Sequence, residues 1–444
     1  MMDIREAASY IVGEGSLERK AHIERILQPV KDQVVTVTLE DLLSVGEPQL
    51  PASDFRFNYS YDELIDIARD ITDGTPEEVD RVFRYGMVYS GVVPESECIE
   101  HVYRDLGYGQ ERFPRVTARI HNKRLSLRTL NIDGAVSNSS KPTSSCFRYK
   151  KENGKEFIIN GNYKAHITGR YYGASVNVLS YVTDTLGGID MTINPIMKCP
   201  NSCKMCCRTY DLYTSKCNLF NFKPEEMARY LVCKYGVHIL EALRSVAIIT
   251  GAFRSPDDAL DYIERFNSCL SNLTSGRFDP LHNDSQFYKI SSHCFDSLHY
   301  MEKLKKVGVK QYMYSVEMVS DYRKEILTNG EILKGKLNLA SIKEVLETAA
   351  SVWGNNYVEP TYVIGLDSFD DTFQWIDLLS SIGITKMTRA LYNAYSPEQC
   401  KYYKMDLKSA LVCALEINRR FSSGYHQYLN GNLKKREGWS DGQY

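Results

Sequence analysis

The sequence predicts an α/β protein in which six strand–helix units form an open, partial barrel, preceded by a helical segment and a β-rich segment. Two observations lead to this prediction. From about residue 187 onward, short apolar runs alternate with helix-start signals, which is the pattern of a parallel sheet with helices outside it. Before that point, apolar residues recur first with helical and then with strand-like spacing.

Residues 1–110 are predicted to form a helical N-terminal domain. Apolar residues recur at intervals of three and four in Ala21–Leu27, Tyr61–Ala68 and Val79–Gly86. Thr75-Pro-Glu-Glu78 adds a capping residue, a first-turn proline and two acidic residues, which together indicate a helix start.

Residues 111–186 are predicted to form a β-rich module. The candidate strands are 113–120, 157–160 and 175–182, which are short and alternate in polarity. Glu152-Asn-Gly-Lys155 has the sequence of a tight hairpin turn.

Residues 187–395 are predicted to form the barrel. The six expected strands are 189–196, 245–250, 287–291, 311–316, 357–364 and 387–391. The helices that follow them are expected at 224–235, after Ser255, at 297–307, at 341–352, after Ser368 and at Ser396. Six units are fewer than the eight of a closed barrel, so the sequence predicts a partial (β/α)6 TIM-like barrel. The capping box Ser396-Pro-Glu-Gln399 is expected to begin a long helix in the C-terminal segment 396–444.

Composition limits the classes of partner. The chain has 444 residues, 43% of them hydrophobic, which is enough for a sizeable core. A net charge of -2 leaves no basic footprint for nucleic acid, and no apolar run approaches the roughly 20 residues that cross a bilayer. Twelve cysteines are too sparse for a disulfide scaffold. We therefore expect a cytoplasmic protein without nucleic-acid or membrane partners.

Three cysteines stand close together in Cys199-Pro-Asn-Ser-Cys203-Lys-Met-Cys206, on a loop after the first barrel strand. Thiolates are soft ligands, so this group indicates zinc or an iron–sulfur cluster rather than magnesium or calcium. Three ligands can hold three corners of a [4Fe–4S] cube and leave the fourth iron open for a small molecule. The alternative is a structural zinc site, which closes its shell with four ligands, and Cys207 or Cys217 could supply the fourth.

The Cys-x3-Cys-x2-Cys loop, following the apolar run 189–196, resembles the signature of the radical S-adenosylmethionine (SAM) enzymes. The resemblance implies that Cys199, Cys203 and Cys206 bind a [4Fe–4S] cluster whose open iron chelates SAM. It also implies that one electron, from a donor such as flavodoxin or ferredoxin, cleaves SAM to methionine and a 5′-deoxyadenosyl radical. Met205 departs from the family pattern, in which this position is usually aromatic, but a methionine can still pack against adenine.

The resemblance further implies which residues contact SAM, at the carboxyl ends of the strands, where parallel α/β folds bind ligands. Thr250-Gly251-Ala252 would hold the SAM amino group, although these residues are equally compatible with a structural turn. Glu317 would bind the ribose hydroxyls, although an isolated glutamate is usually a surface group. Met205, Ile364, Gly365 and Leu391 would contact adenine. The motif order is most similar to the biotin synthase branch, without that branch's second-cluster cysteines.

The expected reaction is abstraction of a hydrogen atom from a small polar substrate, such as a sugar, nucleoside or amino acid derivative. Two alternatives stay open: radical modification of a peptide held by the N-terminal segment, and a non-catalytic zinc-binding protein. Side chains near the strand ends are candidates to line the cavity: His293, Tyr314, Glu359, Arg389, Asn393 and Tyr395.

Overall fold

The computed structural model describes about two thirds of the chain in two compact units. The described ranges are 56–101, 115–121, 123–130, 145–171, 180–185, 188–196, 221–292, 295–320, 338–396 and 398–421, with 199, 201 and 203–206 of the cysteine loop. Among them, the residues of Met1–Ala174 and Asn393–Tyr403 form the first unit, and the rest form the second. The helix expected at 21–27 lies outside these ranges. No helix in the described part of the chain is both long and apolar enough to cross a bilayer.

The second unit is built around a seven-stranded sheet with the order β13-β12-β11-β10-β9-β8-β7. Its strands are β7 (Ser180–Thr185), β8 (Gly188–Ile193), β9 (Leu243–Ile249), β10 (Phe287–Ser292), β11 (Val309–Glu317), β12 (Val358–Ile364) and β13 (Thr388–Leu391). Neighbours from β8 to β13 are parallel, which confirms the partial (β/α)6 barrel. β7 pairs antiparallel with β8 at the edge, whereas the sequence prediction assigns its residues to the β-rich module of 111–186.

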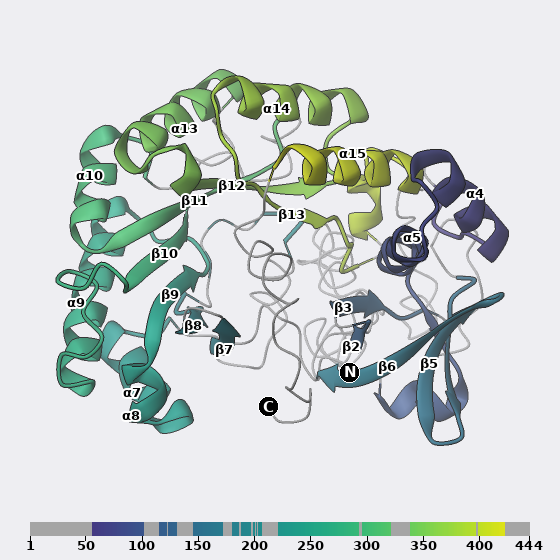
Figure 1. The fold of residues 1–444 in the computed structure, drawn as a ribbon, viewed down its shortest axis with the longest axis horizontal. Helices are drawn as coiled ribbons and strands as arrows, with labels where there is room; N and C mark the ends of the chain where they lie inside the picture. Colours follow the sequence, from purple (N-terminus) through teal and green to yellow (C-terminus); the bar gives the residue numbers. More distant parts are fainter. Residues whose placement is uncertain are drawn as a thin grey trace, which may run out of the picture. The chain divides into compact units, whose positions relative to one another are not determined.

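Helices follow the parallel strands and lie along the outer side of the curved sheet (Figure 1). They are α7 (Pro224–Tyr235), α8 (Val237–Glu241), α9 (Pro256–Leu273), α10 (Leu298–Lys306), α13 (Leu339–Trp353), α14 (Phe369–Ser381) and α15 (Leu407–Arg420). The predicted helix starts at Ser255 and Ser368 are confirmed, because each side chain accepts a hydrogen bond from the backbone N–H three residues on.

Aromatic side chains fix which face of the sheet meets the helices. Tyr312 of β11 stacks on Trp353 of α13, with ring centres 5.2 Å apart. Tyr362 of β12 stacks on Trp375 of α14 at 6.1 Å. Because side chains alternate along a strand, every second residue counted from Tyr312 on β11 and from Tyr362 on β12 faces the helices. The residues between them face the inside of the barrel.

In the part of the first unit that the structure describes, two α-helices accompany a six-stranded sheet of order β1-β4-β5-β6-β2-β3. Its elements are α4 (Tyr61–Ile71), α5 (Pro76–Ser90), β1 (Val93–Pro94), the 3-10 helix η2 (Ser96–His101), β2 (Arg115–Ile120), β3 (Lys123–Arg128), β4 (Arg148–Glu152), β5 (Lys155–Asn160) and β6 (Tyr163–Tyr171). The predicted cap at Thr75 is confirmed. So is the hairpin turn, since Glu152 pairs with Lys155 around Asn153 and Gly154, both with positive φ.

Residues 393–403 belong to the first unit, although they follow the last strand of the barrel. The predicted helix start at Ser396 is wrong. Its capping bond does form, because the Gln399 N–H donates to Ser396 Oγ at 3.3 Å. It begins only a 3-10 helix, η5 (Glu398–Tyr402), because the segment is held by contacts of Cys400 and Tyr403 within the first unit. The long helix, α15, begins after a new cap at Asp406.

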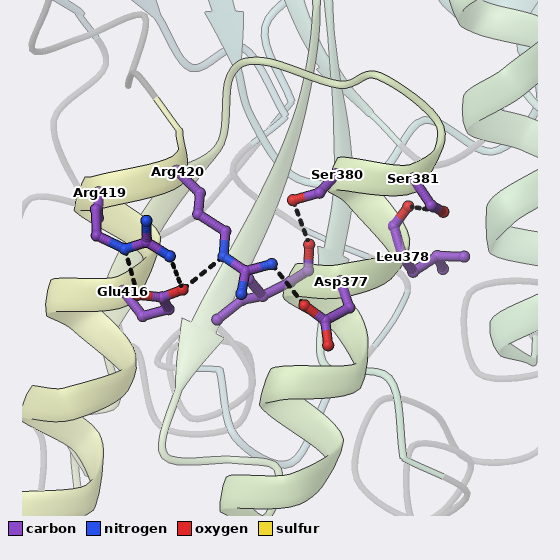
Figure 2. A network of polar contacts seen from close by, with 8 residues as sticks. Asp377, Leu378, Ser380, Ser381, Glu416, Arg419 and Arg420 are labelled. Carbon is purple, nitrogen blue, oxygen red and sulfur yellow. Dashed lines mark hydrogen bonds and ion pairs between the residues drawn. The ribbon is translucent and has the colours of Figure 1, made fainter.

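Helices α14 and α15 are joined by a charged network, shown in Figure 2. Glu416 accepts hydrogen bonds from Arg419 and Arg420, and Arg420 also donates to Asp377 of α14 at 2.5 Å. The bonds from Arg419, with those from Arg420, lower the pKa of the Glu416 carboxyl from 4.5 to about 2, against the opposing effect of burial.

We expect Glu416→Gln to destabilise the second unit by only about 1 kcal/mol at low salt, because Arg419 and Asp377, two members of the network, are exposed to solvent. Because the folded state lowers the pKa of Glu416, its carboxylate stabilises the folded state above pH 4.5. This stabilisation is lost as the pH falls toward about 2. Denaturation followed by tryptophan fluorescence at pH 7 and pH 3 measures it. Glu344→Gln, at an exposed position of α13, is the control; an equal effect from both variants would contradict the prediction.

Candidate functional site

The cysteine loop is fastened to the turn that follows β9. Ile196 donates its N–H to Thr250 Oγ1 at 2.6 Å, and its carbonyl accepts the Gly251 N–H at 3.1 Å. Three residues further on, Cys199 Sγ accepts the Ala252 N–H at 3.3 Å. The structure thus brings the predicted ligand Cys199 together with all three residues of the predicted Thr250-Gly251-Ala252 site.

The other two cysteines of the loop form a tight turn of their own. The Cys206 N–H donates to the Cys203 carbonyl at 2.9 Å. The Cys203 side chain is 8% exposed, whereas Cys199, Met205 and Cys206 are half-buried. In the described structure, none of these three cysteines forms a disulfide bond. Among the described residues, no three His, Cys, Asp or Glu side chains are gathered as for a single metal ion, so cluster binding stays a prediction. Cys207 and Cys217 lie outside the described residues.

Gly251 is required by close packing rather than by backbone conformation. A Cβ added at this position would lie 2.6 Å from the Ile196 carbonyl oxygen and 2.9 Å from Cys199 Cβ. Both neighbours belong to the base of the cysteine loop. Any larger residue at 251 must therefore displace the loop or the turn.

We expect Gly251→Ala to destabilise the second unit by about 1 to 3 kcal/mol, the usual cost of overpacking, and to lower the iron bound after reconstitution. Denaturation and iron content measure the two effects. Gly169→Ala is the matched control, because its Cβ would meet nothing nearer than 3.7 Å. Unchanged iron content in the Gly251 variant would mean that the turn does not support the cysteine loop.

Glu317 ends β11 at the same edge of the sheet as the cysteine loop, because β8 to β11 are parallel. Its backbone is left-handed, with φ of 61°, and it follows a register shift against β12, where it pairs with Tyr362. Its side chain is half-buried. A left-handed non-glycine residue at the end of a strand is uncommon and points to a constrained turn.

The predicted adenine contacts lie on the neighbouring strand ends. Ile364 pairs with Leu391, and its carbonyl accepts the Tyr392 N–H at 2.8 Å. The Gly365 carbonyl accepts the Lys404 N–H at 2.8 Å. Ile364 lies two residues after Tyr362 on the same strand, so its side chain also faces the helices. Only its backbone can meet a ligand at the sheet edge. The adenine role of Ile364, Gly365 and Leu391 stays a prediction.

Several expected cavity residues are placed elsewhere. Tyr314 is fully buried and has the parity of Tyr312, so it faces the helices. Glu359 lies at the opposite, amino end of β12, where it accepts hydrogen bonds from Gln311 and Thr388. Arg389 donates to Asn418 of α15.

The remaining three cavity candidates cannot be assigned to the barrel. Asn393 and Tyr395 belong to the segment 393–403 of the first unit. His293 lies outside the described residues.

Sequence reasoning missed the polar groups that do line this end of the barrel. Ser291 of β10 and Ser315 of β11 face inward, and their hydroxyl oxygens lie 3.1 Å apart. Thr361 of β12 pairs with Ser315, and its side chain also faces the inside of the barrel. Strand alternation, counted from the buried tyrosines, could have found them.

No protein-family model matches the chain, and no curated protein matches it. Solved structures do resemble it. The FeFe-hydrogenase maturase HydG from Carboxydothermus hydrogenoformans is 14% identical, with a TM-score of 0.38, over 52% of this chain and 52% of its own. HemN from Escherichia coli, a coproporphyrinogen III oxidase described as a radical SAM enzyme, is 13% identical, with a TM-score of 0.34, over 51% and 50%.

SuiB of Streptococcus suis, solved bound to S-adenosylmethionine, is 14% identical, with a TM-score of 0.33, over 52% of this chain and 49% of its own. The similarity thus spans about half of this chain and about half of each of these proteins. At these identities and TM-scores, the likenesses assign no activity to this chain.

Proposed function

We propose that the protein is a radical SAM enzyme that binds a [4Fe–4S] cluster through Cys199, Cys203 and Cys206. The observation that carries the proposal is the Cys-x3-Cys-x2-Cys loop at the carboxyl edge of a parallel sheet, fastened to a turn with no room for a Cβ at Gly251. Parallel α/β folds bind ligands at this edge. Three soft sulfur donors fit an iron–sulfur cluster.

When bound with SAM, a cluster held by these three cysteines would supply one electron for cleavage of the S–C5′ bond, and the 5′-deoxyadenosyl radical released would take a hydrogen atom from the substrate. The Ala252 N–H, donated to Cys199 Sγ, would stabilise the charge on that thiolate, and hydrogen bonds to cluster sulfurs tune reduction potential. Thr250 and Gly251 would hold the SAM amino group. Glu317 would accept hydrogen bonds from the ribose hydroxyls, and Met205, Gly365 and Leu391 would meet adenine.

The substrate we propose is a small polar molecule, such as a sugar, nucleoside or amino acid derivative. The inward hydroxyls of Ser291, Ser315 and Thr361 near the carboxyl edge support it, since a few placed polar groups orient a ligand in a pocket. A flavodoxin or ferredoxin would supply the electron.

Anaerobic reconstitution of the full chain with iron and sulfide tests the proposal. We expect iron and sulfide in the ratio of one [4Fe–4S] cluster per chain, and, after reduction with dithionite, formation of 5′-deoxyadenosine and methionine from SAM. Omitting the reductant is the control. A colourless chain that binds zinc and yields neither product would overturn the proposal in favour of a structural zinc site.

The substrate class is tested separately with deuterated pools of polar metabolites and of peptides. We expect deuterium to pass from a small polar metabolite into 5′-deoxyadenosine. Transfer from the peptide pool alone would contradict the proposed substrate class while leaving the radical chemistry intact.

A further inference from the structure

A buried aspartate ties together the loops that follow β11 and β12. Asp367 is fully buried. Its Oδ2 accepts the Val319 N–H at 2.7 Å and the Tyr362 hydroxyl at 2.8 Å, and its Oδ1 accepts the Ser320 N–H at 3.0 Å. Burial raises the pKa of this carboxyl, against the lowering effect of the Ser320 and Val319 donors.

Two of the three donors, the Val319 and Ser320 N–H groups, belong to the backbone that follows Glu317. Only Met318 separates Glu317 from Val319, and the Met318 N–H donates to the Val316 carbonyl at 2.9 Å, which closes a tight turn. On its other side, Glu317 is held by its ladder pairing with Tyr362. Tyr362 therefore pairs with Glu317 of the turn through its backbone and donates its hydroxyl to Asp367.

We propose that Asp367 is a positioning residue for the nucleoside of SAM, acting through Glu317. The inference rests on the proposed function, because it takes Glu317 as the ribose-binding carboxylate. Asp367 clamps the 319–320 backbone to the end of β12 and so holds Glu317 in its left-handed conformation, with its carboxylate at the ligand-binding edge of the sheet.

The chemistry of the clamp requires a carboxylate. All three partners are donors, and a carboxylate accepts on both oxygens. An asparagine keeps one acceptor and turns an NH2 group toward one of the donors. Asp367→Asn therefore loses at least one charge-assisted bond while keeping the size of the side chain.

Hydrogen exchange of the cluster-free chain tests the clamp itself, without any need for cofactor. We expect the Val319 and Ser320 amides of Asp367→Asn to exchange roughly 10- to 100-fold faster, since hydrogen bonds to charged groups are the strong ones, with Met313 in the middle of β11 unchanged. Asp370→Asn, at an exposed position of α14, is the matched control. Unchanged exchange at 319 and 320 would overturn the proposal.

Ligand binding to the reconstituted chain tests the link to SAM. We expect Asp367→Asn to raise the Kd for SAM about tenfold or more, while the Kd for methionine, which has no ribose, stays unchanged. Because Asp367 would act through Glu317, the double variant with Glu317→Gln should bind SAM no more weakly than Glu317→Gln alone.

The outcomes separate the inference from the proposed function. If the wild type binds no SAM, the proposed function fails, and the nucleoside role of Asp367 fails with it. If the wild type binds SAM and the two substitutions add, or methionine and SAM weaken together, the positioning role alone is overturned.

Discussion

Cys203→Ala is expected to abolish formation of 5′-deoxyadenosine from SAM and to leave the reconstituted chain without a stable [4Fe–4S] cluster. Cys203 is the middle one of the three proposed ligands, and its thiol is the only one of the three that is buried in the described structure. Its loss leaves two loop ligands for four irons, and a protein cluster of this type is held by cysteine thiolates. Iron and sulfide content and a chromatographic assay measure the two effects.

Two further cysteines make the result specific. Cys233→Ala removes an exposed thiol on α7 and should leave both iron content and product unchanged. Cys207→Ala distinguishes a cluster from zinc: a four-ligand zinc site completed by Cys207 would lose its metal in this variant, whereas the proposed cluster would not. Full activity of Cys203→Ala would contradict the ligand assignment.

Local signals predicted the barrel well because most of its helix boundaries are set by a few neighbouring residues. Ser255 and Ser368 each bond the N–H three residues on, and this interaction depends on nothing distant. The same signal gave a wrong prediction of a long helix at Ser396. There the capping bond forms, but the contacts of Cys400 and Tyr403 with Arg128 limit the segment to a short 3-10 helix. β3 and β6 were not predicted, although Ala165 and Ile167 of β6 are buried and alternate with polar residues as in a half-buried strand.

The candidate site was predictable where the chemistry is contiguous in sequence. The cysteine loop could be named from its spacing, and the Thr250-Gly251-Ala252 turn from the family resemblance and its place after the second barrel strand. The structure brings them together. Asp367 could not be named, because its role depends on N–H groups 48 and 47 residues earlier in the chain. Tyr314 was misplaced because a strand's sequence does not tell which of its two faces meets the helices.

Arg128→Met is expected to weaken the first unit by about 2 to 3 kcal/mol, with little effect on the second. Arg128 is fully buried at the end of β3. It donates to the Tyr89 carbonyl of α5 and to the Tyr403 hydroxyl at 3.4 Å, and its guanidinium lies 5.2 Å from the centre of the Phe57 ring. Methionine keeps much of the length and apolar volume of the arginine side chain but removes its charged donors. The buried acceptors that they bonded then lose these hydrogen bonds, which costs stability.

Hydrogen exchange is the appropriate measurement, because the tryptophans of the described ranges, Trp353 and Trp375, both lie in the second unit and report only on it. Amides of α5, β3 and residues 398–403 should exchange roughly 30- to 150-fold faster together, since 1.4 kcal/mol corresponds to a factor of ten. Arg148→Met, at an exposed position of β4, should change little. If exchange rose only in 398–403, Arg128 would hold that segment in place without stabilising the unit. The joint response would show instead that the segment leaving the last barrel strand is an integral part of the N-terminal unit's core.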